Sequence, residues 1–164
     1  MKKLLATAFI FIFTICLPLK AEVLEAGISI EDVPQGLFGL WRVNAKLDDT
    51  NSYQTFKAQS IDFWNLLRIG DNVKLENPYS GANAEISIKT IEGNLIVFQK
   101  KANYASNKTL TDTVHLRLEN DKFSGINTLK LETFSLVDGH LMKTETAQYI
   151  IKGEKLSGDS ILAE

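Results

Sequence analysis

The sequence predicts an all-β domain, an antiparallel meander of about eight or nine strands that closes wholly or partly into a barrel. Three observations lead to this prediction. Many short segments alternate apolar and polar residues, which is the period of a strand with one buried and one solvated face. Residues that favour turns separate these segments at short intervals. No segment shows a clear helical period.

The first predicted strand, residues 37–47, shows the alternation most clearly. Trp41, Val43 and Ala45 lie on one side, with polar or basic residues between them. Gly39 stands two residues before Trp41, where a glycine allows another backbone or ring to come close. The tryptophan supplies a large apolar surface. We therefore expect this strand to bury one face in the core.

The later strands follow the same alternation, and polar turns end them. Residues 77–81 place a proline where a tight turn needs a fixed φ, and residues 92–94 contain the glycine of a hairpin turn. A further turn is predicted at residues 152–154. The predicted strands cover residues 37–47, 57–69, 73–75, 84–89, 95–98, 110–118, 122–136 and 141–151, with a short last strand at Leu156 and Ile161.

Two of these strands carry apolar residues on both faces. In residues 57–69, Trp64 lies opposite Phe63, which favours a central or covered strand and leaves an amphipathic helix as the alternative. In residues 122–136 the alternation changes phase, and one register cannot bury both apolar sets. We expect a bulge or bend there, to which Gly125 contributes.

Polar residues interrupt the pattern at three further places. Residues 100–108 are predicted as a long polar connection with Tyr104 in its middle. Asp112 falls on the apolar side of residues 110–118, and we expect it at the exposed start of that strand. The middle of residues 141–151 is polar, which predicts either an edge strand or the wall of a polar cavity.

The arrangement of the strands has two solutions. Closing the meander into a barrel removes the exposed sheet edges that invite aggregation. A two-sheet β-sandwich is the alternative.

The first 21 residues have the pattern of a secretory signal peptide. Lys2 and Lys3 precede an apolar run that Pro18 ends, and Ala21 is a small residue at the expected cut point. The run is shorter than the roughly 20 residues that span a bilayer, and an uncleaved anchor is the alternative. Cleavage would also remove Cys16, the only cysteine. We therefore expect a secreted or periplasmic protein without a membrane-spanning segment.

The rest of the chain is long enough for one domain. Residues 22–36 are predicted as a lead-in segment that either lies across the domain or is mobile, and residues 37–164 as a single all-β domain. Without its three leader lysines, the chain keeps 15 of its 18 basic residues against 20 acidic ones, a formal charge of −5. It has no basic stripe, so a nucleic-acid partner is not expected.

Residue types that carry chemistry do not gather in a recognisable pattern. His115 and His140 are the only histidines, and they lack the spacing of metal ligands. There is no nucleophile elbow, phosphate loop or dinucleotide fingerprint. The sequence therefore predicts no catalytic residues, no metal site and no cofactor, and a function other than catalysis.

Gly39-Leu40-Trp41 resembles the Gly-X-Trp opening of the lipocalins and related calycin barrels. In that family the tryptophan closes the base of an eight-stranded barrel that carries a small apolar ligand. Thr111-Asp112-Thr113 matches two residues of the family's Thr-Asp-Tyr element, and no arginine follows Arg117 to pack on the tryptophan. The resemblance implies a calycin-like barrel without naming a ligand.

These observations favour an exported, non-enzymatic binding protein whose barrel holds a small apolar ligand or an envelope component. Trp64 and Tyr104 are the expected ligand-binding residues at the mouth of the barrel. Trp64 is chosen because it lies opposite Phe63, and Tyr104 because it stands in a polar connection. The alternative is a β-sandwich interaction module of a surface or secreted assembly, which pairs with a partner through an edge strand.

Overall fold

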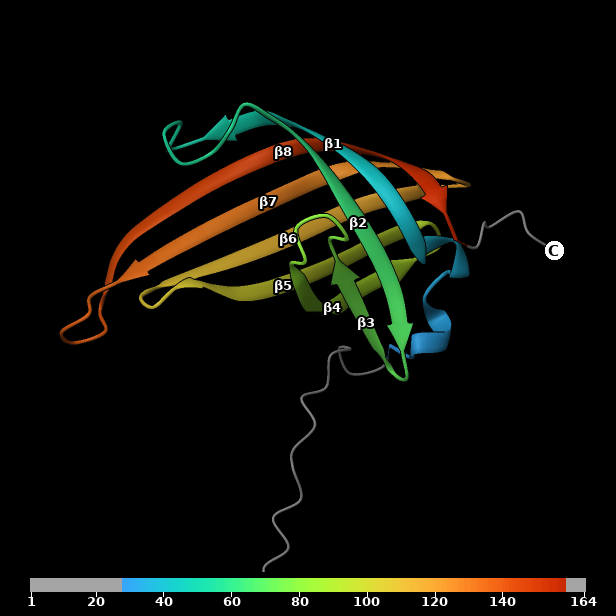
Figure 1. The fold of residues 1–164 in the computed structure, drawn as a ribbon, viewed down its shortest axis with the longest axis horizontal. Coiled ribbons are helices and arrows are strands. Elements are labelled where there is room, and N and C mark those ends of the chain that lie inside the picture. The colour runs from blue at the N-terminus through green and yellow to red at the C-terminus, as the bar shows by residue number, and fades with distance from the viewer. Residues whose placement is uncertain (1–27, 159–164) are drawn as a thin grey trace, which may run out of the picture.

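In the computed structural model, which describes residues 28–158, antiparallel strands form one closed barrel (Figure 1). The strands are β1 (Gly39–Thr50), β2 (Gln59–Ile69), β3 (Asn72–Glu76), β4 (Asn83–Glu92), β5 (Leu95–Ala105), β6 (Lys108–Glu119), β7 (Lys122–Phe134) and β8 (Leu141–Ser157). Each strand pairs with the next one in sequence, and β8 pairs back onto β1. The predicted antiparallel meander and its closure into a barrel are confirmed, and the two-sheet sandwich is wrong.

One end of the barrel, called the base here, is covered by two short 3₁₀ helices, η1 (Ile30–Asp32) and η2 (Gln35–Leu37). Ile30, Val33 and Leu37 of this segment are buried against the core. The part of the lead-in that the structure describes therefore lies across the domain. The predicted signal peptide, residues 1–21, falls outside the described residues. None of the helices within residues 28–158 is long and apolar enough to cross a bilayer.

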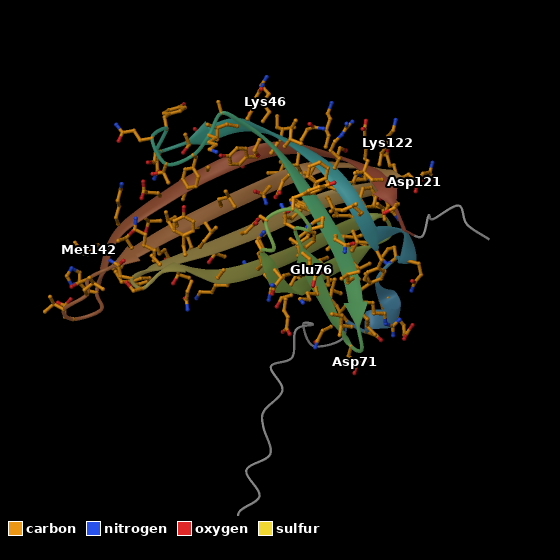
Figure 2. All side chains as sticks on the ribbon, in the orientation of Figure 1. Lys46, Asp71, Glu76, Asp121, Lys122 and Met142 are labelled. Carbon is orange, nitrogen blue, oxygen red and sulfur yellow. The ribbon has the colours of Figure 1, made fainter. Side chains whose placement is uncertain are left out.

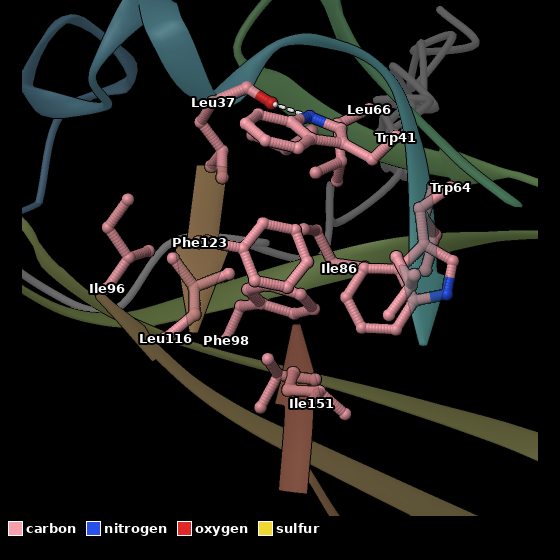
Figure 3. Close-up of a cluster of buried hydrophobic side chains, with 14 of the residues drawn as sticks. Leu37, Trp41, Trp64, Leu66, Ile86, Ile96, Phe98, Leu116, Phe123 and Ile151 are labelled. Carbon is pink, nitrogen blue, oxygen red and sulfur yellow. Dashed lines mark hydrogen bonds between the residues drawn. The ribbon is translucent and has the colours of Figure 1, made fainter. Parts of the chain in front are cut away.

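A group of aromatic side chains fills the barrel next to the base (Figure 3). Trp41 is fully buried, and its Nε1 donates a hydrogen bond of 2.9 Å to the carbonyl oxygen of Leu37. The ring centroid of Phe123 lies 5.1 Å from that of Trp41 and 5.8 Å from that of Trp64. The Nζ of Lys155 lies 5.0 Å from the centroid of the Trp41 ring, at cation–π distance. Trp41 thus joins the lead-in, the core and the end of β8.

The glycine of the Gly-Leu-Trp stretch has a clear structural reason. Gly39 has a φ of 124°, a conformation that side chains rarely adopt. A Cβ at this position would lie 2.4 Å from the carbonyl oxygen of Ser157, because the ends of β1 and β8 approach closely. Only a glycine therefore fits at the point where the barrel closes.

β7 keeps a single phase along its length. Phe123, Asn127 and Leu131 are buried inside the barrel, whereas Ile126 is 42 % exposed on the outside. β7 pairs with β6 without a shift of register, and its pairing with β8 has one shift, between Thr133 and Phe134, so the irregularity within residues 122–136 lies at the end of the strand and not at Gly125. The prediction failed because a polar residue of β7 faces inward and an apolar one faces outward.

The strand predicted at residues 57–69 is confirmed over the alternative helix, although β2 begins only at Gln59. Later boundaries also need correction. The predicted connection at residues 100–108 is wrong, since β5 continues to Ala105 and β6 begins at Lys108. The predicted turn at residues 152–154 is wrong as well, because β8 runs on through them. The predicted last strand splits: Leu156 belongs to β8, and Ile161 lies outside the described residues.

Candidate binding cavity

Above the aromatic group the barrel encloses a cavity of about 330 Å³. Inward-facing residues of β1, β6, β7 and β8 supply its apolar walls: Val43, Leu110, Leu129 and Ile151. The volume lies near the lower end of the range of roughly 300–1,000 Å³ found for small-molecule sites. The cavity is therefore suited to a small ligand.

The loop between β1 and β2 covers this cavity. Phe56 of the loop is only 8 % exposed and lines the cavity. The hydroxyl of Tyr149 on β8 donates a hydrogen bond of 3.0 Å to the carbonyl oxygen of Lys57. Burial raises the pKa of Tyr149, so this hydroxyl keeps its proton at neutral pH. This hydrogen bond thus fixes the β1–β2 loop to a side chain of β8.

A second cavity of about 180 Å³ shares part of its lining with the first. The common residues are Asp62, Trp64, Lys100 and Leu110. From there the second cavity extends to the loop between β3 and β4. Together, the two cavities therefore extend from the interior of the barrel to its wall at the β3–β4 loop.

The short length of β3 explains this sideways extension. Within the described residues, β3 pairs only with the second half of β2, so residues 59–64 have no partner strand on that side. Side chains close the wall instead: Asn77 donates a hydrogen bond of 2.5 Å to the carboxylate of Asp62. Outside, the rings of Phe63 and Tyr79 lie 4.5 Å apart between centroids. The wall here depends on side chains rather than on a backbone ladder.

Three polar residues point into the cavity from neighbouring strands. Asp112 is 5 % exposed and accepts a hydrogen bond from the side-chain amide of Asn127, which is 7 % exposed. The Nζ of Lys100 lies 3.0 Å from the other carboxylate oxygen of Asp112. A buried charge is costly unless it is paired and hydrogen-bonded, and Asp112 is both. The group places hydrogen-bonding atoms on one side of a mostly apolar cavity, whose lining also includes Ser60 and Asp62.

The structure does not bring the two predicted ligand-binding residues together. Trp64 is 6 % exposed, lines both cavities and donates from Nε1 to Asp62 at 3.0 Å. Tyr104 is 68 % exposed in β5, at a register shift between Asn103 and Ala105, and lines neither cavity. Tyr104 is therefore at the surface, and Trp64 is inside.

Sequence reasoning missed the polar group, although a signal for it was present. Asp112 was expected at an exposed strand start, and this was wrong. It stands in the same alternation as Val114 and Leu116, whose side chains are buried. Lys100 likewise continues the alternation of Phe98 in β5. A polar residue at a position that alternates with buried residues was therefore the signal in the sequence for this polar group.

Glu145 forms a second buried polar group, below the β1–β2 loop. Its carboxylate is 4 % exposed and accepts hydrogen bonds of 2.6 Å from each of the hydroxyls of Ser52 and Thr55. The Nζ of Lys143 lies 2.9 Å away. These three groups, the two hydroxyls first, lower the pKa of Glu145 from 4.5 to about 2. Residues 141–146 of β8 pair with β7 but have no partner in β1, so this part of the strand is an edge, and Glu145 in it belongs to a buried polar group.

The low pKa of Glu145 predicts a pH dependence of stability. Because the folded state favours the carboxylate, its contribution is complete above pH 4.5 and disappears as the pH falls toward about 2. We expect Glu145→Gln to be less stable than the wild type at neutral pH, with the difference closing across that window. Urea unfolding at a series of pH values measures this, with Glu85→Gln at an exposed position as the control. A difference that stays constant with pH would contradict the prediction.

The histidines do not form a metal site. His115 is exposed on β6, and His140 contacts Asp138 at 2.6 Å in the loop between β7 and β8. Within the described part of the chain, no group of three or more His, Cys, Asp or Glu residues could hold a metal ion.

Comparisons with known proteins add no assignment. No protein-family model matches the sequence, and no curated protein matches it either.

Proposed function

We propose that this chain is an exported, non-enzymatic binding protein that holds a small, mostly apolar molecule inside its barrel. The observation that carries the proposal is the cavity of about 330 Å³, with apolar walls and the polar group of Lys100, Asp112 and Asn127 on one side. Apolar lining with a few polar groups is typical of small-molecule sites. The ligand then has an apolar body and an end that forms hydrogen bonds.

A distant relationship to the lipocalins is part of this proposal. Support comes from the burial of Trp41 at the base and from Lys155, whose ammonium group packs on the Trp41 ring. In that family an arginine packs on the tryptophan, and in this chain a lysine occupies that place. Export is proposed from the pattern of residues 1–21 alone. The alternative function, an interaction module, required a two-sheet sandwich, and the strands form a closed barrel instead.

A substitution that fills the cavity tests the proposal. Ala45 lines the cavity, whereas its neighbour Lys46 is exposed on the outer face of β1. We expect Ala45→Phe to bind the apolar dye N-phenylnaphthylamine at least about tenfold more weakly than the wild type, because the new ring occupies the ligand's space. Lys46→Phe adds the same ring outside and is expected to leave binding unchanged.

Two measurements decide the outcome. Dye fluorescence gives the affinity, and native mass spectrometry of the protein recovered from the secreting host shows whether a small molecule is carried. We expect both the dye fluorescence and the mass of a bound small molecule to be lost in Ala45→Phe and kept in Lys46→Phe. Equal dye affinity in all three proteins would place binding outside the barrel and contradict the proposal.

A further inference from the structure

The β1–β2 loop closes the end of the barrel opposite the base through several polar contacts. The hydroxyls of Ser52 and Thr55 donate to the buried carboxylate of Glu145. Asn51 exchanges three hydrogen bonds of 2.8 to 3.3 Å with backbone atoms of β8. Phe56 of the same loop is buried and lines the larger cavity, the one of about 330 Å³. A ligand that passed through this end would have to break these contacts together.

The side wall of the barrel is closed less firmly, because two strands lack a neighbour there. β3 ends at Glu76, which Figure 2 shows well short of the end of the molecule that carries Met142. Among the described residues, 59–64 of β2 have no partner in β3, and 100–105 of β5 have no partner in β4. Residues of both stretches and of the β3–β4 loop, 77–82, surround the smaller cavity (Figure 1). Backbone hydrogen bonds therefore do not close this part of the wall.

The β3–β4 loop is an ordered turn that is attached to the barrel through side chains. Within the turn, the side chain of Asn77 accepts a hydrogen bond of 2.9 Å from the N–H of Tyr79, and its own N–H donates to the carbonyl oxygen of Ala82 at 2.7 Å. The side chain of Asn77 also donates to Asp62 of β2. On the outer surface the ring of Tyr79, which is 73 % exposed, contacts the ring of Phe63. Breaking these two side-chain contacts would free the turn to move as a unit.

We propose that the ligand enters and leaves the barrel through this side wall, with the β3–β4 loop as the gate. The proposal rests on the proposed function, since it concerns the path of the molecule held inside. Asn77 and Ala82 line the smaller cavity, which shares Asp62 and Trp64 with the larger one, so an outward movement of the loop connects both cavities to solvent. The free edge of β2 is not left for a strand of another protein, because the side chain of Asp62 accepts a hydrogen bond of 2.9 Å from the N–H of Phe63.

A thiol inside the barrel measures access to the cavity without any ligand. In a Cys16→Ser background, Leu129→Cys introduces the only thiol of the chain, at a position that lines the larger cavity. Asn77→Asp keeps the side-chain oxygen that organises the turn but places a second carboxylate against Asp62. We expect it to speed the alkylation of this thiol by iodoacetamide at least about tenfold, because the gate opens more often. Tyr79→Ser, which removes the ring contact, should act in the same direction.

A variant at the end of the barrel is the matched control. Ser52→Ala removes a hydroxyl that holds the β1–β2 loop to Glu145, and we expect it to leave the alkylation rate unchanged. Urea unfolding of each variant gives its global stability. A rate that rises in Ser52→Ala but not in Asn77→Asp would place the entrance at the end of the barrel and overturn the proposal. A rise in Asn77→Asp that only follows a loss of global stability would overturn it too.

Closing the gate tests the path of the ligand itself. Asp62→Cys with Asn77→Cys, again with Cys16→Ser, is bridged by the short, reducible cross-linker ethanediyl bismethanethiosulfonate. We expect the bridge to slow the entry of N-phenylnaphthylamine in stopped-flow fluorescence at least about tenfold, and reduction to restore it. The same bridge between Ser52→Cys and Glu145→Cys should leave the entry rate unchanged.

The two experiments separate the gate from the function. An entry rate that is the same with the side wall bridged and unbridged would overturn the proposed gate while leaving a binding barrel in place. A wild-type protein that does not bind the dye would count against the proposed function, whereas the thiol alkylation rates still decide whether the side wall opens.

Discussion

Gly153→Ala is expected to lower the free energy of unfolding by about 2–3 kcal/mol, because its methyl group competes with an aromatic ring for space. A Cβ at Gly153 would lie 2.1 Å from Cε1 of Phe123, its cross-strand partner. The Phe123 ring cannot yield easily, since it packs against the rings of Trp41 and Trp64. Denaturant unfolding followed by tryptophan fluorescence measures the loss.

A double-mutant cycle gives this prediction its control. Phe123→Ala alone should cost about 3–5 kcal/mol, the usual range for truncating a buried phenylalanine. In that background Gly153→Ala should be neutral or stabilising by roughly 0.5–1 kcal/mol, since alanine suits a strand better than glycine. Lys152→Ala on the outer face should change little. If Gly153→Ala costs the same in both backgrounds, ring and methyl group do not compete.

The strands themselves were predictable from the sequence because burial inside a barrel imposes a period of two residues. Trp41, Val43 and Ala45 show this in β1, whose inward positions are apolar as far as Leu47, and a strand was predicted there, although β1 runs over Gly39–Thr50 rather than over residues 37–47. Turn residues such as the Gly93-Asn94 pair then marked most of the hairpins. Local chemistry was enough wherever apolar residues faced inward and polar residues faced outward.

The prediction failed where the interior itself is polar. The sequence predicts that β5 ends near Phe98, because residues 100–108 are polar, yet Lys100 faces the cavity. It also predicts a turn at Gly153, whereas this glycine leaves room for the ring of Phe123. In both cases the deciding contact comes from another strand. A prediction from local sequence alone does not include contacts between distant strands.

The cavity was harder to predict than the fold for the same reason. Trp64, predicted at the mouth of the barrel, lines the cavity, whereas Tyr104 does not, and ligand binding by Trp64 stays a prediction. Lys100 and Asp112 are direct cross-strand partners of β5 and β6, but this register depends on the length of the hairpin between them. With residues 100–108 treated as a loop, the two side chains could not be paired.

The pair of Lys100 and Asp112 leads to the second large expected effect. Asp112→Leu should lower the free energy of unfolding by about 3 kcal/mol, since it leaves the Lys100 ammonium group and the Asn127 amide facing an apolar wall. Adding Lys100→Met should recover the stability to within about 1 kcal/mol of the wild type, because two matched apolar residues replace a buried ion pair at little cost. The exposed cross-strand pair of Arg42 and Glu154, changed to Met and Leu, should shift the free energy of unfolding by less than about 1 kcal/mol.

The double variant separates stability from ligand recognition. If Lys100 and Asp112 form hydrogen bonds to the ligand, we expect the double variant to fold like the wild type but to lose any small molecule that native mass spectrometry detects on the wild-type protein. The apolar dye, which needs no such bonds, should bind as well as before or more tightly. Denaturant unfolding, native mass spectrometry and dye titration on one preparation give the three readouts. A double variant as unstable as Asp112→Leu alone would instead give the ion pair a structural role, because the barrel would then need the charges even without a ligand.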